Sequence, residues 1–194
     1  MSRNYRNGTY VAFDGNGEVN PTKSDLKYFC ILKAWQENDS IDFNFINSHE
    51  KTYSVRDTSS EETLKSRLNE RMKNSKNLLV IVSEDTNYDR GFLNYEISRA
   101  IKAYDLPVII AYVGEFDSIE FKYGYFWDVI GVRKGNNSRI SLKGRLPKEL
   151  KDAIENSNIN CIHIPFNKDV IKECINKYGC NYSNLKGHKN TMGV

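Results

Sequence analysis

The chain has 194 residues, of which 39% are apolar and 27% are charged, and its formal net charge is +3. This length fits one domain with a sizeable core, and the low net charge with scattered basic residues argues against nucleic-acid binding. No segment approaches the roughly 20 apolar residues that span a bilayer, and the N-terminal residues lack the apolar core of a signal peptide. We therefore expect a cytoplasmic protein that does not bind membranes.

The N-terminal part of the chain predicts two strands with a helix between them. Thr9 to Phe13 is a short apolar strand, and a polar segment leads to a helix over Asp25 to Asn38. Apolar residues occupy most of the circumference of this helix, so we expect it to be well buried. Phe43 and Phe45 alternate with polar residues in Asp42 to Asn47, which predicts the second strand.

A second helix follows a loop rich in charge and hydroxyl groups, Ser48 to Thr58. Ser59 or Ser60 begins the helix, because Ser59 to Glu62 fits the S-x-x-E capping box. Its apolar stripe is narrow and consists of Leu64, Leu68 and Met72.

The central segment predicts a strand, a helix and a second strand. Leu78 to Val82 and Val108 to Val113 are apolar runs rich in β-branched residues, separated by a polar loop, Ser83 to Gly91, and a helix, Phe92 to Tyr104. Strands separated by a helix cannot form a hairpin, so we expect them to be parallel neighbours. The helix has one apolar stripe that should face the sheet, formed by Leu93, Ile97, Ala100, Ile101 and Tyr104.

An insertion is predicted from Gly114 to Leu146, because this interval is too long for a simple connection between elements. Within it, Ile130 to Leu142 has the pattern of a hairpin that turns at residues 135–137. An aromatic cluster precedes the hairpin and suits either an interface or packing against the body of the domain; it comprises Phe121, Tyr123, Tyr125, Phe126 and Trp127.

The C-terminal part predicts a helix from Pro147 to about Asn156, a strand over Asn160 to Pro165 and a helix over Asp169 to Tyr178. Strands near residues 10, 44, 80, 110 and 162 thus alternate with helices. This pattern predicts an α/β fold with a flavodoxin-like, doubly wound parallel sheet of five strands in the order 2-1-3-4-5, with an insertion after the fourth strand. We expect residues 1–179 to form a single domain and residues 180–194 a flexible tail.

A metal site is not expected from the cysteines. None of the four belongs to a C-x-x-C pair, and a combination of Cys161, His163, Cys174 and Cys180 matches no structural zinc spacing. We therefore expect reduced thiols in the core and no metal.

Two familiar sites fit the loop after the first strand only in part, and a third site involves residues from several loops. Gly15 to Asn20 lacks the third glycine of a dinucleotide fingerprint, and the same loop has Val19 where a calcium loop requires glycine. A phosphorylated receiver domain shares the predicted strand order. Asp14, Asp85 and Lys168 lie roughly at its functional positions, but its acidic pair is incomplete.

Glu96 is the first candidate for a functional residue. It lies at the margin of the apolar stripe of the central helix, one turn after Phe92, and faces the crevice where open α/β sheets bind ligands. Partial burial there would raise the pKa of its carboxyl group. The alternative is an ordinary glutamate near a helix start, favoured by the helix dipole or paired with Arg99.

The stretch around Glu96 has a more specific pattern. A buried strand ends in a small polar residue in Ser83-Glu-Asp-Thr-Asn87, a threonine follows, and Phe92-Leu-Asn-Tyr-Glu96-Ile opens the helix. This pattern resembles the TIR-like domain family that includes the TIR proteins of the Thoeris antiphage system. Phe13-Asp14 and the stretch Trp127 to Gly131 agree with other elements of that family, and the resemblance runs from about Thr9 to Phe166.

The resemblance implies an enzyme of prokaryotic defence signalling that cleaves NAD at the nicotinamide–ribose bond and yields a linear or cyclic ADP-ribose-type signal. NAD would be the substrate, and no cofactor is implied. By similarity, Glu96 is the expected catalytic residue. The expected substrate-binding residues are Phe13 and Asp14 at the nicotinamide end, Ser83 and Phe92 on the floor of the crevice, and Arg56 at the diphosphate.

A second interpretation is a non-catalytic TIR-like module that associates with itself or with other signalling proteins. The family has a tryptophan four residues before the glutamate, and this chain has Phe92 there. Phenylalanine keeps a stacking face but lacks the indole N–H donor, which points toward the second interpretation.

Overall fold

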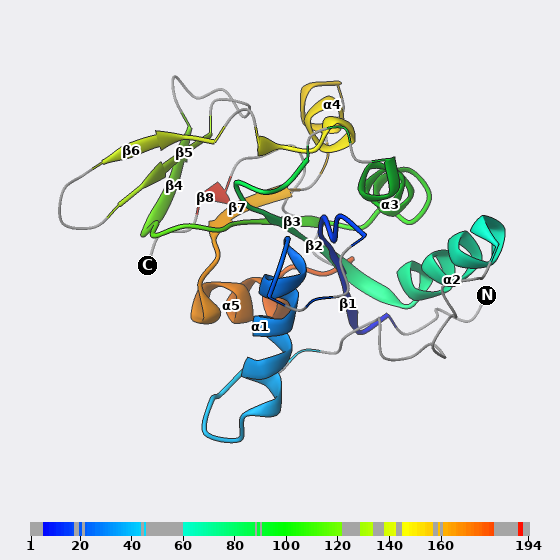
Figure 1. Cartoon of the computed structure of the whole chain (residues 1–194), viewed down its shortest axis with the longest axis horizontal. Coiled ribbons are helices and arrows are strands. Elements are labelled where there is room, and N and C mark those ends of the chain that lie inside the picture. The colour runs from blue at the N-terminus through cyan, green and yellow to red at the C-terminus, as the bar shows by residue number, and fades with distance from the viewer. Residues whose placement is uncertain are drawn as a thin grey trace.

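A parallel sheet separates two layers of helices in the computed structural model (Figure 1). Its strands β1 (Gly8–Ala12), β2 (Ser75–Val82), β3 (Val108–Tyr112) and β7 (Cys161–Pro165) lie side by side in this order, each parallel to the next. The structure describes residues 6–17, 20, 22–43, 45, 60–87, 89, 91–121, 129–133, 138–142, 145–156, 159, 161–180 and 190–191.

The predicted unit of two parallel strands around a helix is confirmed. β2 and β3 pair in parallel from Leu78 opposite Val108 to Val82 opposite Tyr112, and α3 (Gly91–Lys102) connects them. All five residues of β3 are buried, as expected for a parallel strand with helices on both faces.

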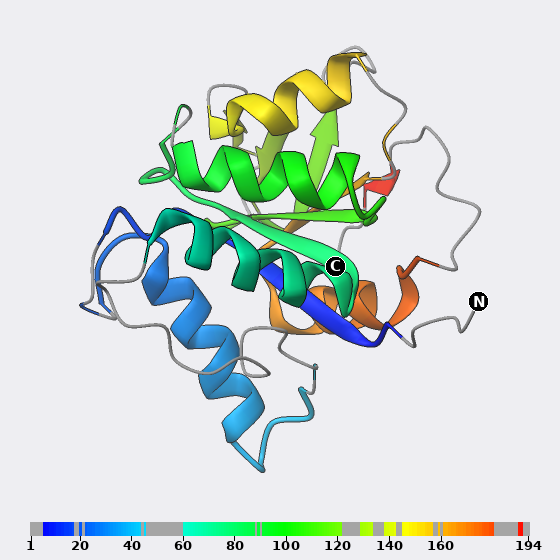
Figure 2. The same cartoon turned by 90° about the vertical axis from the view of Figure 1, so that its right-hand side faces the viewer.

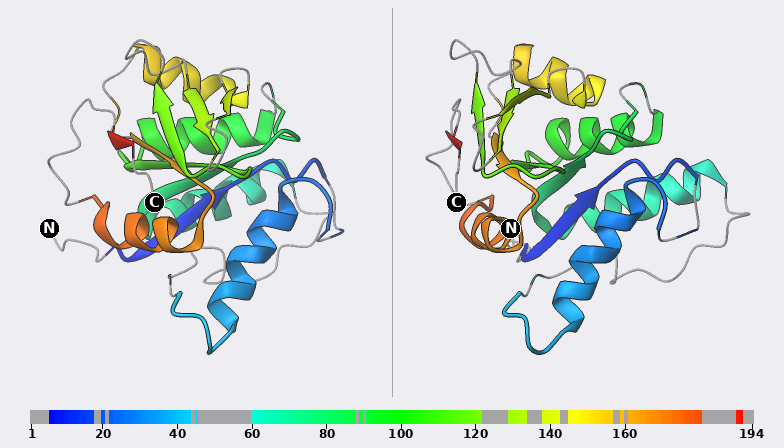
Figure 3. Two further views of the ribbon diagram at one scale, coloured as in Figure 1. Left: turned by 90° about the vertical axis from the view of Figure 1, so that its left-hand side faces the viewer. Right: turned by 60° about the vertical axis from the view of Figure 1, so that its left-hand side comes forward.

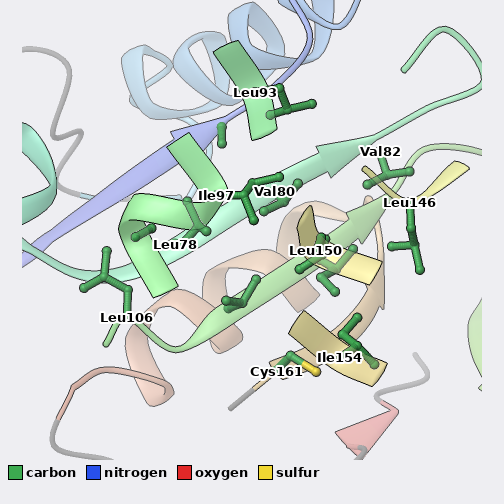
Figure 4. Close-up of a cluster of buried hydrophobic side chains, with 14 of the residues drawn as sticks. Leu78, Val80, Val82, Leu93, Ile97, Leu106, Leu146, Leu150, Ile154 and Cys161 are labelled. Atoms are coloured by element: carbon green, nitrogen blue, oxygen red, sulfur yellow. The ribbon is translucent and has the colours of Figure 1, made fainter. Parts of the chain in front are cut away.

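The helices divide between the two faces of the sheet (Figure 2). α2 (Glu61–Lys73), α3 and α4 (Lys148–Asn156) contribute to one core cluster, while α1 (Leu26–Glu37) and α5 (Lys168–Lys177) contribute to the other. Figure 4 shows side chains of α3, α4 and β2 gathered in the first cluster, among them Leu93, Ile97, Leu150, Ile154, Leu78, Val80 and Val82.

Two features of the N-terminal third differ from the prediction. Leu32 is the buried residue of α1, and Ile31 is 38% exposed, so the expectation that this helix is well buried was wrong. A helix that covers a sheet buries one face, whatever residues occupy the rest of its circumference.

The predicted strand over Asp42 to Asn47 is not a strand at residues 42, 43 and 45; its other residues lie outside the described part. Phe43 and Phe45 are nevertheless buried, and their rings pack 5.7 Å apart. Gln36 donates a hydrogen bond from Nε2 to the carbonyl of Phe45, at 2.9 Å. The alternation of apolar residues therefore reflects two buried rings beside α1 instead of a position in the sheet ladder.

The insertion forms an antiparallel sheet of its own (Figure 3), made of β4 (Ser118–Phe121), β5 (Val129–Val132) and β6 (Arg139–Ser141). β5 and β6 are the predicted hairpin, while its turn and the side chains of the aromatic cluster lie outside the described residues. Buried residues on β4 and β5 join the core cluster under α4, so the insertion packs against the body of the domain.

The predicted tail contains one short strand. β8 (Asn190–Thr191) pairs in parallel with β7, and residues 181–189 and 192–194 lie outside the described part. Across the described helices, none combines the length and the apolar character needed to cross a bilayer.

Asn77 provides a test of how α5 is attached to the sheet. It is buried in β2, and its Nδ2 donates to the carbonyls of Ile175 (3.1 Å) and Tyr178 (2.6 Å) at the end of α5. We expect Asn77→Ala to lower the free energy of unfolding by about 2 to 4 kcal/mol, because both carbonyls lose their donor in a buried site. Urea unfolding measures this loss.

Asn74→Ala is the matched control. Asn74 donates from Nδ2 to the carbonyl of Glu70 at an exposed helix end, so its replacement should cost less than about 1 kcal/mol. Equal losses in the two variants would show that the bond to α5 is not what makes Asn77 important.

Candidate functional site

A cavity of about 500 Å³ lies beyond the carboxyl end of β1. The loop after β1 forms one wall and the first turns of α3 form the other. The lining residues are Phe13, Asp14, Gly15, Asn16, Gly17, Gly91, Phe92, Leu93 and Glu96. This is the edge of the sheet at which open α/β folds bind ligands, and the structure brings four of the six predicted site residues together there.

Glu96 lines the cavity as a half-buried side chain. Its Oε1 accepts a hydrogen bond from the hydroxyl of Tyr10 in β1, at 3.0 Å. Burial raises the pKa of Glu96 to about 7, and the Tyr10 hydrogen bond and the charge of Arg71 oppose this rise only in part. A carboxyl group that titrates near neutral pH is suited to exchange protons with a ligand.

The alternative interpretation of Glu96, a pair with Arg99, is not what the structure has. Arg99 donates from Nε to Asn69 Oδ1 of α2, at 3.2 Å. The carboxylate of Glu96 lies instead between β1 and the cavity, which is the arrangement expected of a ligand-binding group.

Two phenylalanine rings give the cavity an apolar, aromatic character. Phe92 is 47% exposed at the start of α3, although a side chain of this size is usually buried. Phe13 stacks on Phe29 of α1, with ring centroids 5.0 Å apart and planes 16° from parallel. The rings therefore offer faces on which a planar, apolar or cationic group could stack.

Asp14 shapes the cavity through its hydrogen bonds. Its Oδ1 accepts from the amide of Asn16 at 2.9 Å, and its Oδ2 accepts from the amide of Asn87 at 3.0 Å. Asn16 and Gly17 have positive φ angles of 50° and 68°, so the loop turns sharply here. The Asp14 carboxylate thereby links the loop after β1 to the loop after β2.

Asp25 makes a second link between the same loops, and sequence reasoning missed it. It is fully buried, its carboxylate accepts from the hydroxyls of Ser83 and Thr86 (2.6 Å for Thr86), and its amide donates to the carbonyl of Asp14 at 3.2 Å. Burial raises the pKa of Asp25, and the two hydroxyl donors oppose the rise. In the sequence, Asp25 has only the position of an acidic residue at a helix start, which is too common to single it out.

Two predicted substrate-binding residues are not among the lining residues. Ser83 is 1% exposed; besides its bond to Asp25, its Oγ accepts from the amide of Asp85 at 3.0 Å. Ser83 therefore stabilises the loop after β2 through these hydrogen bonds and does not line the cavity. Arg56 lies outside the described residues, so its contact with a diphosphate stays a prediction.

Several residues of the metal and receiver-like sites that the sequence fitted only in part have other partners in the described part of the chain. Within the described part of the chain, no three His, Cys, Asp or Glu side chains are grouped to hold a metal ion. His163 instead bonds through Nδ1 to the hydroxyl of Tyr112, at 3.0 Å. Of the receiver-like positions, Asp85 pairs with Lys27 at 3.0 Å, and Lys168 pairs with Asp169 at 3.6 Å.

The raised pKa of Glu96 predicts how stability depends on pH. The folded-state pKa of Glu96, about 7, exceeds its ordinary value of 4.5. The contribution of this group to stability is therefore fully present at a pH below 4.5. That contribution is lost as the pH rises through about 7. The loss is at most about 3 kcal/mol, and solvent screening of a half-buried group reduces it.

Glu96→Gln lacks this titration, so we expect it to gain stability relative to the wild type as the pH rises from about 5 to about 8. Urea unfolding of both proteins across this range measures the difference. Parallel stability curves would contradict the raised pKa.

Comparison with protein families identifies a family for this chain. The family model described as Thoeris protein ThsB, TIR-like domain, matches residues 10–116. The match covers more than half of the chain and includes the four predicted site residues that line the cavity. It ends at residue 116, before β4, so the resemblance noted at Trp127 to Gly131 lies beyond it. The chain belongs to the family of the Thoeris protein ThsB TIR-like domain.

Proposed function

We propose that this TIR-type defence signalling protein cleaves NAD at the nicotinamide–ribose bond, with Glu96 as the catalytic carboxylate and an ADP-ribose-type signal as the product. One observation carries the proposal: a half-buried carboxylate with a pKa of about 7 lines a cavity that also contains two phenylalanine rings. Membership of the Thoeris ThsB family supports the role in defence signalling.

The chemistry of the reaction suits a fixed carboxylate. When the bond from ribose C1′ to the pyridinium nitrogen breaks, its electron pair goes to the nitrogen and nicotinamide leaves as a neutral molecule. The ribose then carries positive, oxocarbenium-like charge, which an ionised Glu96 would stabilise while it accepts hydrogen bonds from the ribose hydroxyls. Bond formation to C1′ by water, or by a nucleophilic atom of the same ADP-ribose, releases a proton that Glu96 can accept.

The walls of the cavity suit the nicotinamide end of NAD. The rings of Phe13 and Phe92 offer stacking faces, and the glycines of both walls let a ligand approach the backbone closely. The charges of Asp14 and Glu96 favour a cationic pyridinium ring. None of the nine described lining residues is basic, so the diphosphate would lie outside this cavity, toward the loop that contains Arg56.

The second candidate function is a non-catalytic interaction module. Exposure of Phe92 is the observation that favours it, since an exposed aromatic side chain is also a frequent contact for a partner protein. In that case the cavity edge would contact another signalling protein or a second copy of this chain.

Nicotinamide release from NAD by the purified protein distinguishes the two functions. We expect Glu96→Gln to reduce the rate by about 100-fold or more, because it removes the charge that stabilises the transition state and keeps the size of the side chain. Glu70→Gln is the matched control, since Glu70 is an exposed residue of α2 paired with Arg67, and it should leave the rate unchanged.

The assay should cover dilute and crowded conditions and include an activating partner where one is found. If the wild type releases no more nicotinamide than Glu96→Gln under all of them, the enzymatic function is rejected. The interaction module would then be the better description.

A further inference from the structure

We propose that Tyr10 is a positioning residue for Glu96: its hydroxyl holds one carboxylate oxygen against β1 and leaves the other oxygen to the ligand in the cavity. This proposal rests on the catalytic role of Glu96 proposed above. Tyr10 is not among the lining residues of the cavity, so it acts through Glu96 and not on the ligand.

Packing fixes the place of the donor. Tyr10 is fully buried in β1, and its side chain belongs to the core cluster that includes Leu93 and Ile97, two residues of α3 close to Glu96 in sequence. A ring enclosed in this way cannot swing aside without opening the core. The hydroxyl is therefore a fixed point 3.0 Å from Glu96 Oε1, whereas an unbonded glutamate side chain would sample several rotamers.

The bond also distinguishes the two protonation states of Glu96. A hydroxyl donates a stronger hydrogen bond to a carboxylate than to a neutral carboxyl group, so Tyr10 favours the ionised form. Among the described residues, the charge of Arg71 of α2 acts on Glu96 in the same direction, Asp14 lines the same cavity, and Tyr95 of α3 acts on Tyr10. Tyr10 is the neighbour whose hydrogen bond to Glu96 supports the ionised form.

Tyr10→Phe tests the proposal, because it removes the hydroxyl and keeps the buried ring. The pKa of Glu96 can be followed in the free protein by NMR of its ¹³C-labelled carboxyl carbon, with Glu96→Gln to identify the signal. We expect the pKa of Glu96 to rise by about one pH unit in Tyr10→Phe. The acid limb of the pH profile of kcat/KM for nicotinamide release should move upward by the same amount.

Tyr112→Phe is the matched control. Tyr112 is also a buried tyrosine of the parallel sheet, but it lies on β3 and bonds to His163. Removal of its hydroxyl should leave the pKa of Glu96 and the acid limb in place.

A second variant replaces Tyr10 with 3-fluorotyrosine. The hydroxyl of 3-fluorotyrosine is a stronger hydrogen-bond donor than that of tyrosine, so this variant should lower the pKa of Glu96.

The proposal is overturned if the pKa of Glu96 is the same in Tyr10→Phe and the wild type, or if Tyr112→Phe shifts it equally. Because the titration uses the protein without NAD, it separates this proposal from the proposed function. If the wild type releases no nicotinamide, the proposed NAD reaction is rejected. The titration would still decide whether the Tyr10 hydroxyl influences the pKa of Glu96.

Discussion

Two buried carboxylates hold together the loops on which the candidate site depends. Asp14 bonds to backbone amides in both loops, and Asp25 accepts hydroxyl donors from Ser83 and Thr86 across the same junction. A buried carboxylate is costly unless its oxygens find donors, so each of these side chains strongly favours the one arrangement of the loops that supplies them. The cavity exists because this arrangement leaves a space between the loop after β1 and the start of α3.

The carboxyl group of Glu96 differs from these two carboxylates in its hydrogen bonds. Asp14 and Asp25 have donors on both oxygens, whereas the hydrogen bond to Glu96 is at Oε1, from Tyr10. Its pKa is therefore governed mainly by burial and rises to about 7. Burial raises the pKa of Asp25 as well, but the Asp25 carboxylate has hydroxyl donors on both oxygens, whereas the Glu96 carboxyl group lines the cavity.

Parallel strand pairing brings these groups to one place. β1 and β2 run in the same direction, so the residues that follow them emerge at the same edge of the sheet, beside the first turns of α3. The ThsB family match, residues 10–116, covers most of β1 and all of β2, α3 and β3, whereas the antiparallel strands of the insertion and α4, β7, α5 and β8 lie beyond it. The conclusions about defence signalling therefore concern the part of the chain that also forms the cavity.

The sequence by itself determined the β2–α3–β3 unit and the position of Glu96 at the margin of the α3 stripe, because these follow from local periodicity and from one short motif. Periodicity could not show that Phe43 and Phe45 are buried beside α1 without a place in the ladder. Only the tertiary structure decided the roles of Asp25 and Tyr10. Their hydrogen bonds join residues 58 to 86 positions apart in the sequence. No local pattern marks such pairs, because a tyrosine on a strand and an aspartate before a helix are both common.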